Sequence, residues 1–278
     1  MQEFKSNILS LTGLAESNQG GRSENQDDLG AQDTPLGFLT IVCDGMGGGP
    51  GGRTASHIVK TEIIRILCDC EATTSRETAF KMAATKANDA LMKQMELHPE
   101  LAGMGSTFVA VLINKQSAFV AFAGDSRCYR IHDKKVLFRT QDHSLVGELV
   151  RSKALTEEEA RTSPQSNVIS RGLGSIANHI PEIIEVPFKK GDKFILCTDG
   201  VWGSMPHKEL LKHLFSKTSI KSIINDLSSK VDELGRKNGG HHDNHTIAII
   251  EMDCDSTFQE KGNGIYQSIM NLFKRKHI

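Results

Sequence analysis

The sequence lacks the features of a membrane, exported or nucleic-acid-binding protein. No apolar run approaches the length of a membrane span, and residues 1–10 mix polar and apolar side chains without the apolar stretch of a signal peptide. The chain has 33 basic and 34 acidic residues, a formal net charge of -1, so no excess positive charge indicates a nucleic-acid partner. We therefore expect neither a transmembrane segment nor a nucleic-acid partner, and any function that depends on charge must be local.

Paired cysteines are also missing. The six cysteines are scattered without any Cys-x-x-Cys spacing, and Cys43 and Cys197 lie inside apolar runs, where a reduced cysteine behaves as a small hydrophobic residue. This usage fits a reducing compartment, so we expect the protein to be cytoplasmic.

The chain is long enough for one domain with a sizeable core, since 38% of its 278 residues are hydrophobic. Short apolar runs predict buried strands at 38–43, 107–113, 118–123, 193–197 and 246–252. One-sided apolar patterns predict helices within 55–67, 79–91 and 220–234. Because strands and helices come in groups with little alternation, the pattern favours an α+β fold of antiparallel sheets covered by helices.

Two segments differ from this core. Residues 144–166 are polar, and Thr156 with Glu159 three positions later forms a capping box, so we expect a short helical flap within a catalytic domain spanning 1–253. In the remaining tail, 254–278, apolar residues recur at helical spacing before a basic end. This predicts a short amphipathic helix, which packs on its own domain or touches a partner or membrane surface.

Two of the predicted strands end in the same way, with an aspartate followed by a glycine. They are Asp44-Gly45 and Asp199-Gly200, and in each the glycine is expected to let the backbone turn. A carboxylate at the mouth of a buried strand is costly to desolvate unless a positive charge compensates, and a divalent cation does so efficiently. An aspartate that merely opens a turn is common and would explain either site alone.

Three more aspartates stand at strand edges beside turn residues, namely Asp27, Asp125 and Asp243. Five such positions are hard to explain as turns alone. Aspartate oxygens suit hard ions, so the pattern favours magnesium or manganese over zinc, which prefers histidine and cysteine ligands.

An ordered set of short motifs spans nearly the whole chain. They are Arg22-x-x-Asn25-Gln26-Asp27, Asp44-Gly45-Met46-Gly47-Gly48, Gly105-Ser106-Thr107, Gly124-Asp125-Ser126-Arg127, Asp142-His143-Ser144, Arg171-Gly172-Leu173-Gly174, Asp199-Gly200 and Asp243-Asn244. Each is weak alone, but in this order the set resembles the PPM family, the metal-dependent protein phosphatases 2C. The Asp-Gly-Met-Gly-Gly variant resembles the bacterial branch, whose members commonly oppose Ser/Thr kinases.

The resemblance implies a four-layer α-β-β-α sandwich with a dinuclear metal centre at one edge. Asp44 would bridge two manganese or magnesium ions, Gly45 would lend its carbonyl, and Asp199 and Asp243 would hold one ion. A hydroxide bridging the ions would then attack the phosphorus of a phosphoserine or phosphothreonine in a protein substrate, with a Ser/Thr kinase as the opposing partner.

The resemblance also assigns three further roles. Asp27 would order metal-bound water, Asp125 would form a third, weaker ion site with Asp199, and Arg22 would bind the substrate phosphate through paired donors. One departure matters: Met46 stands where many eukaryotic relatives have the histidine proposed as general acid, and a thioether cannot donate a proton. No general acid is therefore named. Residues 49–53 also depart from the family pattern, which leaves the shape of that loop open.

Rival hypotheses use some of the same residues. Residues 47–54 match P-loop spacing with Arg53 in place of the required lysine, which suggests a nucleotide triphosphatase but leaves Arg22 and the other aspartates unexplained. A phosphatase fold that binds phosphoproteins without turnover is a second alternative, disfavoured because every ligand position keeps its aspartate.

Histidines and serines suggest two weaker alternatives. The stretch 239–245 resembles a zinc cluster, but Asp243 has another assignment, and neighbouring histidines in a glycine-rich loop are expected to be solvated. A Ser-His-Asp hydrolase using His143 lacks the Gly-x-Ser-x-Gly elbow, so His143 is expected to make structural hydrogen bonds. Trp202 is expected to pack under the metal loop.

Overall fold

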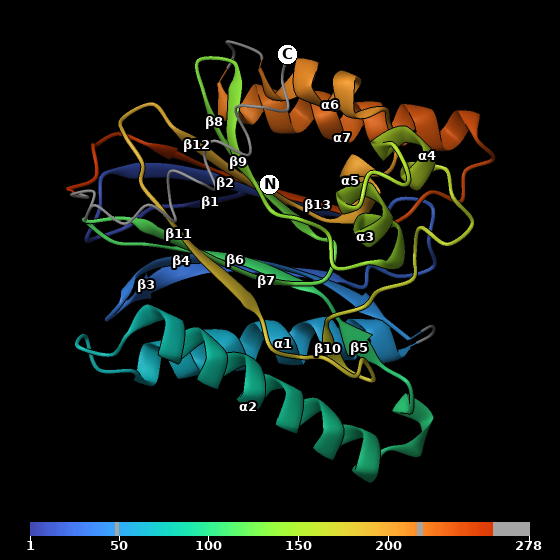
Figure 1. Cartoon of the computed structure of the whole chain (residues 1–278), viewed down its shortest axis with the longest axis horizontal. Coiled ribbons are helices and arrows are strands. Elements are labelled where there is room, and N and C mark those ends of the chain that lie inside the picture. The colour runs from blue at the N-terminus through green and yellow to red at the C-terminus, as the bar shows by residue number, and fades with distance from the viewer. Residues whose placement is uncertain (48–49, 216–218, 258–278) are drawn as a thin grey trace.

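The computed structural model describes residues 1–47, 50–215 and 219–257. Two antiparallel sheets stack face to face, and helices cover both outer faces, as Figure 1 shows. This confirms the expected four-layer sandwich. None of the helices in the described ranges combines the length and the apolar character needed to cross a bilayer.

One sheet has six strands and the other seven. The first runs in the order β1 (Gln2–Phe4), β2 (Leu11–Asn18), β13 (His245–Met252), β12 (Lys193–Cys197), β8 (Arg127–His132) and β9 (Lys135–Arg139). The second runs β10 (Leu173–Gly174), β5 (Gly105–Ser106), β4 (Gly37–Met46), β6 (Phe108–Ile113), β7 (Ala118–Ala123) and β11 (Glu182–Val186), with β3 (Asp27–Thr34) also pairing with β4.

The helices form two outer layers and a group at one end. Helices α1 (Pro50–Asp69) and α2 (Arg76–Leu97) lie on the seven-stranded sheet, with a 3-10 turn at Pro99–Leu101, while α6 (His207–Leu214) and α7 (Ile220–Lys237) lie on the six-stranded sheet. Figure 1 shows α3 (Leu145–Arg151), α4 (Glu157–Arg161) and α5 (Asp199–Trp202) together at one end of the sandwich.

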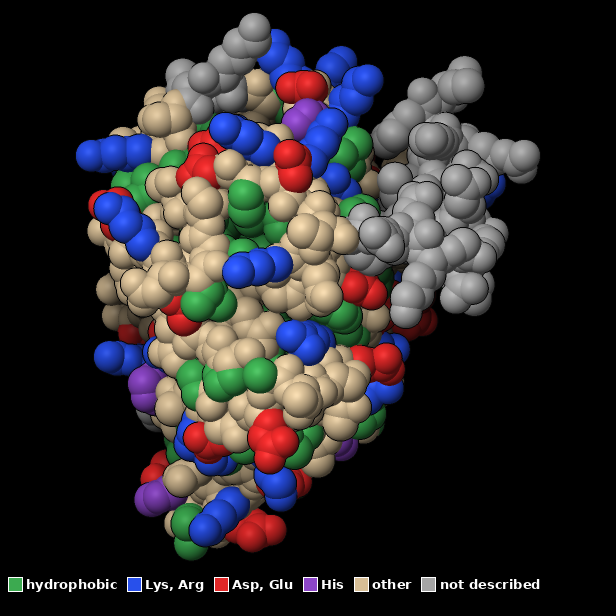
Figure 2. All heavy atoms as spheres, turned by 90° about the vertical axis from the view of Figure 1, so that its left-hand side faces the viewer, with side chains coloured by type: hydrophobic (Ala, Val, Ile, Leu, Met, Phe, Trp, Pro, Cys, Tyr) green, Lys and Arg blue, Asp and Glu red, His purple; other side chains and the backbone are tan. Residues whose placement is uncertain are grey.

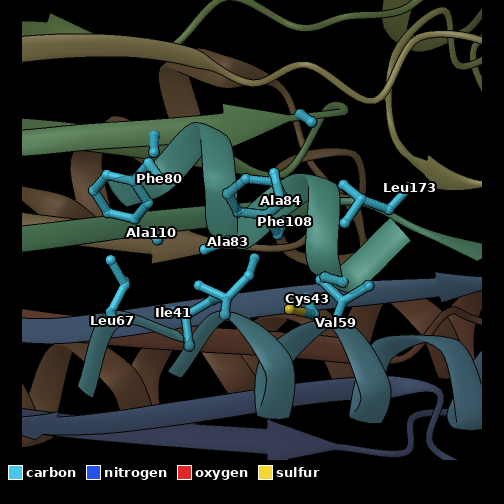
Figure 3. Packing of buried hydrophobic residues seen from close by; sticks show 14 of the residues in the cluster. Ile41, Cys43, Val59, Leu67, Phe80, Ala83, Ala84, Phe108, Ala110 and Leu173 are labelled. Carbon is cyan, nitrogen blue, oxygen red and sulfur yellow. The ribbon is translucent and has the colours of Figure 1, made fainter. Parts of the chain in front are cut away.

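Three apolar cores lie between the four layers. Successive side chains of a strand point to opposite faces of its sheet, so each strand contributes to the core on either side. In β4, Ile41 packs toward α1 and α2, where Figure 3 shows it with Val59 and Phe80, whereas its neighbour Val42 faces the space between the sheets. In β12, Ile195 packs toward α6 and α7 on the other side. A strand that is buried on both faces has a continuous apolar run in its sequence, which explains why these strands could be predicted.

Strands with an exposed or polar face were not predicted. Strand β3 reads Asp-Asp-Leu-Gly-Ala-Gln-Asp-Thr and is mostly half-buried, and β8 places the charged Arg127 and Arg130 in the interior. Arg130 is satisfied there by Asp192, whose Oδ2 lies 2.7 Å from the Arg130 Nε atom. Tertiary pairing, which no local pattern reports, keeps these segments in the sheets.

The predicted flap, residues 144–166, contains two short helices, α3 and α4. Its capping box is confirmed, because the Thr156 hydroxyl accepts from the Glu159 N–H while the Glu159 carboxylate accepts from the Thr156 N–H. Ser144, where this segment begins, pairs with Ile169, just past its predicted end at 166. The predicted tail helix lies outside the described residues, apart from 254–257, where the Thr257 N–H still donates to the Lys115 carbonyl.

The topology contradicts a P-loop. Although β4 and α1 flank residues 47–49, all three strands beside β4 run antiparallel to it. A P-loop follows a strand of a parallel βαβ unit, so the nucleotide triphosphatase hypothesis is wrong.

Candidate metal centre

The site lies where strands of both sheets end at the same edge. Asp44 is near the end of β4, and Asp27 opens β3 directly opposite it in the strand register. Asp199 follows β12, Asp243 precedes β13, and these two strands are neighbours in the other sheet. Asp125 lies in the turn between β7 and β8, which carries the chain from one sheet to the other. The sandwich thus brings together five carboxylates that are far apart in the sequence.

One pocket of about 300 Å³ holds most of the predicted residues. Among the side chains and backbone that line it are Arg22, Asp44, Gly45, Asp125, Asp199 and Asp243. Residues 167 and 169 at the end of the flap segment also line it. A larger hollow of about 1100 Å³ lies beside this pocket, and Asp27 lines that hollow instead. The chemistry belongs to the smaller pocket, because four of the five carboxylates meet there.

Asp27 is held opposite Asp44 by two hydroxyl groups that were not predicted. Its Oδ2 atom accepts from Thr198 Oγ1 at 2.9 Å and from Thr246 Oγ1 at 2.7 Å. Thr198 immediately precedes Asp199, and Thr246 lies in β13. Their only sequence signal is this closeness to predicted ligands, and a threonine at the end of a strand is too common to stand out.

Asn244 ties the two loops of the site together. Its side chain donates to the carbonyls of Gln19 and Glu24, at 2.7 and 2.9 Å, and accepts from the Gln26 N–H at 2.9 Å. Next to it, the Arg22 Nη2 atom donates to Asp243 Oδ2 at 2.8 Å. The Asp243-Asn244 motif therefore positions residues 19–26 as well as supplying a carboxylate.

The two Asp-Gly glycines are needed for space, not for a turn. Neither Gly45 nor Gly200 has a positive φ, which corrects the expectation that they let the backbone turn. A Cβ at Gly45 would lie 2.0 Å from the Gly52 carbonyl oxygen, and one at Gly200 would lie 1.9 Å from that of Asn244. Any side chain would push apart the loops that surround the carboxylates.

Burial and mutual repulsion raise the pKa values of the clustered carboxyls. Burial raises the pKa of Asp27 to about 7, against the Thr246 and Thr198 hydrogen bonds, and raises that of Asp199 to about 6, with the charge of Asp243 adding to it. The pKa values of Asp44 and Asp125 lie well above the usual range, from burial and then from Asp199. Arg22 is the one basic side chain that lines the pocket within the described residues.

This donor set fits hard divalent ions. The pocket presents carboxylate and carbonyl oxygens, which are the ligands that magnesium and manganese prefer. Crowded, buried carboxylates carry a negative charge that the protein leaves largely uncompensated, and bound cations would remove that cost. The residues present therefore suit the implied metal centre.

Residues around Asp125 have structural roles. The Trp202 indole is buried and donates to the Asp125 carbonyl at 3.0 Å, and the Arg127 guanidinium lies 3.6 Å from the ring centre. Arg127 also makes a two-pronged ion pair with Asp142, at 2.9 and 2.6 Å. His143 accepts from the Gly124 N–H and contacts Glu182, so its expected structural hydrogen bonds are confirmed.

The histidines near Asp243 contradict their expected solvation. His241 is exposed, but His242 is largely enclosed and His245 is only 1% exposed. Both approach Asp232 of α7, which packs against this loop.

The sandwich and its edge cluster of carboxylates define the class of metal-dependent phosphatases. A family model for protein phosphatase 2C matches residues 16–238. The chain belongs to the protein phosphatase 2C family, and it is a protein-serine/threonine phosphatase.

Several serine/threonine phosphatases align with this chain over most of their length. The serine/threonine phosphatase stp of Listeria monocytogenes is 30% identical over 241 residues, which cover 84% of this chain and 89% of that protein. The crystal structure of serine/threonine phosphatase Stp1 from Staphylococcus aureus is similar with a TM-score of 0.79 at 26% identity, covering 91% of this chain and 99% of that one. The catalytic domain of the phosphatase PstP, solved with two manganese ions, has a TM-score of 0.74 at 27% identity, covering 87% and 97%.

Proposed function

We propose that the carboxylate pocket binds two manganese or magnesium ions and hydrolyses phosphoserine and phosphothreonine in proteins. The observation that carries this proposal is the convergence of Asp44, Asp199 and Asp243 in one pocket that Arg22 also lines. The two manganese ions in the similar PstP domain support the number of ions. When bound, such ions supply a water of lowered pKa and stabilise negative charge on the phosphoryl oxygens.

Each carboxylate has a separate task in this proposal. Asp44 and the Gly45 carbonyl would hold both ions, and Asp199 and Asp243 would hold one of them. Asp125 lines the same pocket as Asp199, which supports a third, weaker ion site between them. Both threonine hydroxyls donate to the Oδ2 atom of Asp27, and its Oδ1 atom would accept a hydrogen bond from an ordered water.

Arg22 would bind the substrate phosphate. Only its Nη2 atom is engaged by Asp243, so the rest of the guanidinium can form a paired contact with phosphate oxygens. Its side chain is 54% exposed, which leaves it accessible to a substrate. Met46 also lines the pocket, and no histidine does so within the described residues. The chain offers no imidazole there to protonate the leaving oxygen.

The proposed substrates are phosphorylated proteins, and the proposed functional partner is a Ser/Thr kinase. Figure 2 shows basic and acidic side chains interspersed over the face of the molecule that lies away from α3, α4 and α5, so that face carries no single-sign field. All six cysteines are free, which supports a cytoplasmic location.

A metal-titrated phosphatase assay tests this function. The chelator-treated protein is given an aryl phosphate and a panel of phosphopeptides with rising manganese or magnesium. We expect turnover only with a divalent ion, and on phosphoserine and phosphothreonine peptides. Turnover at full rate in chelator would contradict the metal requirement. Binding of phosphopeptides without any turnover would instead support the alternative of a phosphatase fold that binds phosphoproteins without hydrolysing them.

Replacing Arg22 with alanine is expected to raise KM for a phosphopeptide by roughly tenfold, with a smaller change in kcat, because ground-state phosphate loses a charge-assisted contact. Initial rates give both constants. They are measured at saturating manganese, so that the ion site stays filled even though Asp243 has lost its contact with Arg22. Arg236→Ala, at an exposed position of α7, is the matched control. An unchanged KM for Arg22→Ala would remove Arg22 from phosphate binding.

A further inference from the structure

A second group of ligating side chains lies behind the Asp243 loop. It consists of Asp232 from α7, His242 from the loop and His245 at the start of β13, and one ligand atom of each lies within 4.8 Å of the other two. Asp232 Oδ1 is 3.0 Å from His242 Nε2 and 3.9 Å from His245 Nε2. Ligands of a tetrahedral zinc ion, each about 2.0–2.1 Å from the metal, are separated by roughly 3.4 Å, and the two measured distances lie on either side of that value.

His245 gives an independent indication that this cluster binds a ligand. Its ring is 1% exposed, and its Nε2 atom makes no hydrogen bond within the described part of the chain. A buried polar atom without a partner loses its hydration with nothing in exchange, so native structures seldom leave one in place. Asp232 pairs with the Nε2 atom of His242 but lies too far from His245 Nε2 for a hydrogen bond, so a simple Asp-His pair does not account for the cluster.

The surrounding backbone is shaped to admit the His242 ring. A Cβ at Gly235 of α7 would lie 2.1 Å from the His242 ring atoms, so only glycine leaves room at this point of the helix. The His242 carbonyl accepts from the Gly21 N–H at 2.9 Å, which fixes the loop from its other side. Asp232 is 38% exposed, so an ion can reach the cluster from solvent.

We propose that Asp232, His242 and His245 form a separate site for zinc or a similar borderline divalent ion. Two imidazoles and one carboxylate are a donor set that suits zinc, whereas magnesium prefers oxygen ligands. Water would complete the fourth position. The site shares no ligand with the phosphatase centre, but it joins α7 to the loop that carries Asp243 and, through Gly21, to the segment of Arg22. By joining these elements, the bound ion would hold Asp243 and Arg22 in place.

Zinc binding to the full-length protein in excess magnesium tests the proposal. Magnesium fills the carboxylate centre, and a chromogenic chelator then measures the free zinc at each addition. We expect one zinc per chain, and we expect Asp232→Asn and His242→Gln each to weaken its binding by about tenfold or more. Asp226→Asn, at an exposed position of the same helix, is the matched control and should bind zinc as the unaltered protein does.

Cobalt and a variant of the other centre identify where the ion sits. Tetrahedral cobalt with nitrogen ligands absorbs visible light far more strongly than six-coordinate cobalt, so the expected band should appear in the unaltered protein and disappear in Asp232→Asn. Zinc binding should persist in Asp44→Asn. The proposal is overturned if zinc binding is lost in Asp44→Asn, or if it is unchanged in both Asp232→Asn and His242→Gln while circular dichroism shows them folded.

Discussion

Replacing Asp44 with asparagine should lower kcat at saturating manganese by at least about a thousandfold, which corresponds to roughly 4 kcal/mol of transition-state stabilisation. Asp44 is the carboxylate that would contact both ions, and asparagine keeps its shape while removing the charge. The fold should survive, because the pKa of Asp44 is raised by burial and by Asp199, so its charge opposes folding of the ion-free protein. The measurement is kcat on a phosphothreonine peptide, together with the thermal midpoint.

Asp199→Asn should give a loss of similar size, and an exposed carboxylate provides the control. Asp89 lies on the surface of α2, away from the pocket, so Asp89→Asn should leave kcat unchanged. Near-normal turnover of Asp44→Asn, with manganese raised until the rate no longer increases, would mean that Asp44 does not hold the ions.

Manganese affinity should fall by about a hundredfold or more between pH 8 and pH 6. Ions bind the ionised carboxylates, and protons compete for them. The pKa of Asp27 is about 7 and that of Asp199 about 6, while those of Asp44 and Asp125 are higher than usual, so protons occupy the site as pH falls through this window. Each carboxyl that must lose a proton weakens binding by about tenfold per pH unit below its pKa. Calorimetric titration at pH 6, 7 and 8 measures this.

The ion-free protein should show the opposite dependence in its stability. The folded-state pKa of Asp27 is raised above its unfolded value of 3.8, so its favourable contribution is complete below about pH 4 and is lost as pH rises to about 7. Asp27→Asn should therefore raise the thermal midpoint in chelator at pH 8 by more than at pH 5. A manganese affinity that stays constant from pH 8 to pH 6, or an equal gain for Asp27→Asn at both pH values, would contradict the shifted pKa values.

Local chemistry explains which ligands could be predicted. Asp44 and Asp199 follow buried apolar strands, so a charge at the end of each is conspicuous, and the repeated glycine makes the pair stand out. Asp27 and Asn244 carry no such contrast, because they lie among other polar residues. The order of the motifs predicted Asp27, whereas nothing predicted that Asn244 would bind the loop at 19–26.

The prediction for the histidines failed for a related reason. Residues 239–242 look solvated because glycines and histidines follow one another without an apolar neighbour. In the folded chain α7 covers the loop, and Asp232 meets His242 and His245 there. Whether a polar residue is exposed depends on what packs over it. Here the covering element is α7, whose position is determined by the packing of its apolar face.

The sequence by itself determined the apolar strands and helices of the four layers and the identity of the carboxylates, since burial periodicity and oxygen chemistry are properties of local segments. Tertiary structure alone decided which residues share a pocket, why Gly45 and Gly200 must lack a side chain, and how Asp27 comes to be held by hydroxyls 171 and 219 positions away. These are distances between remote parts of the chain, and only the stacking of the two sheets sets them.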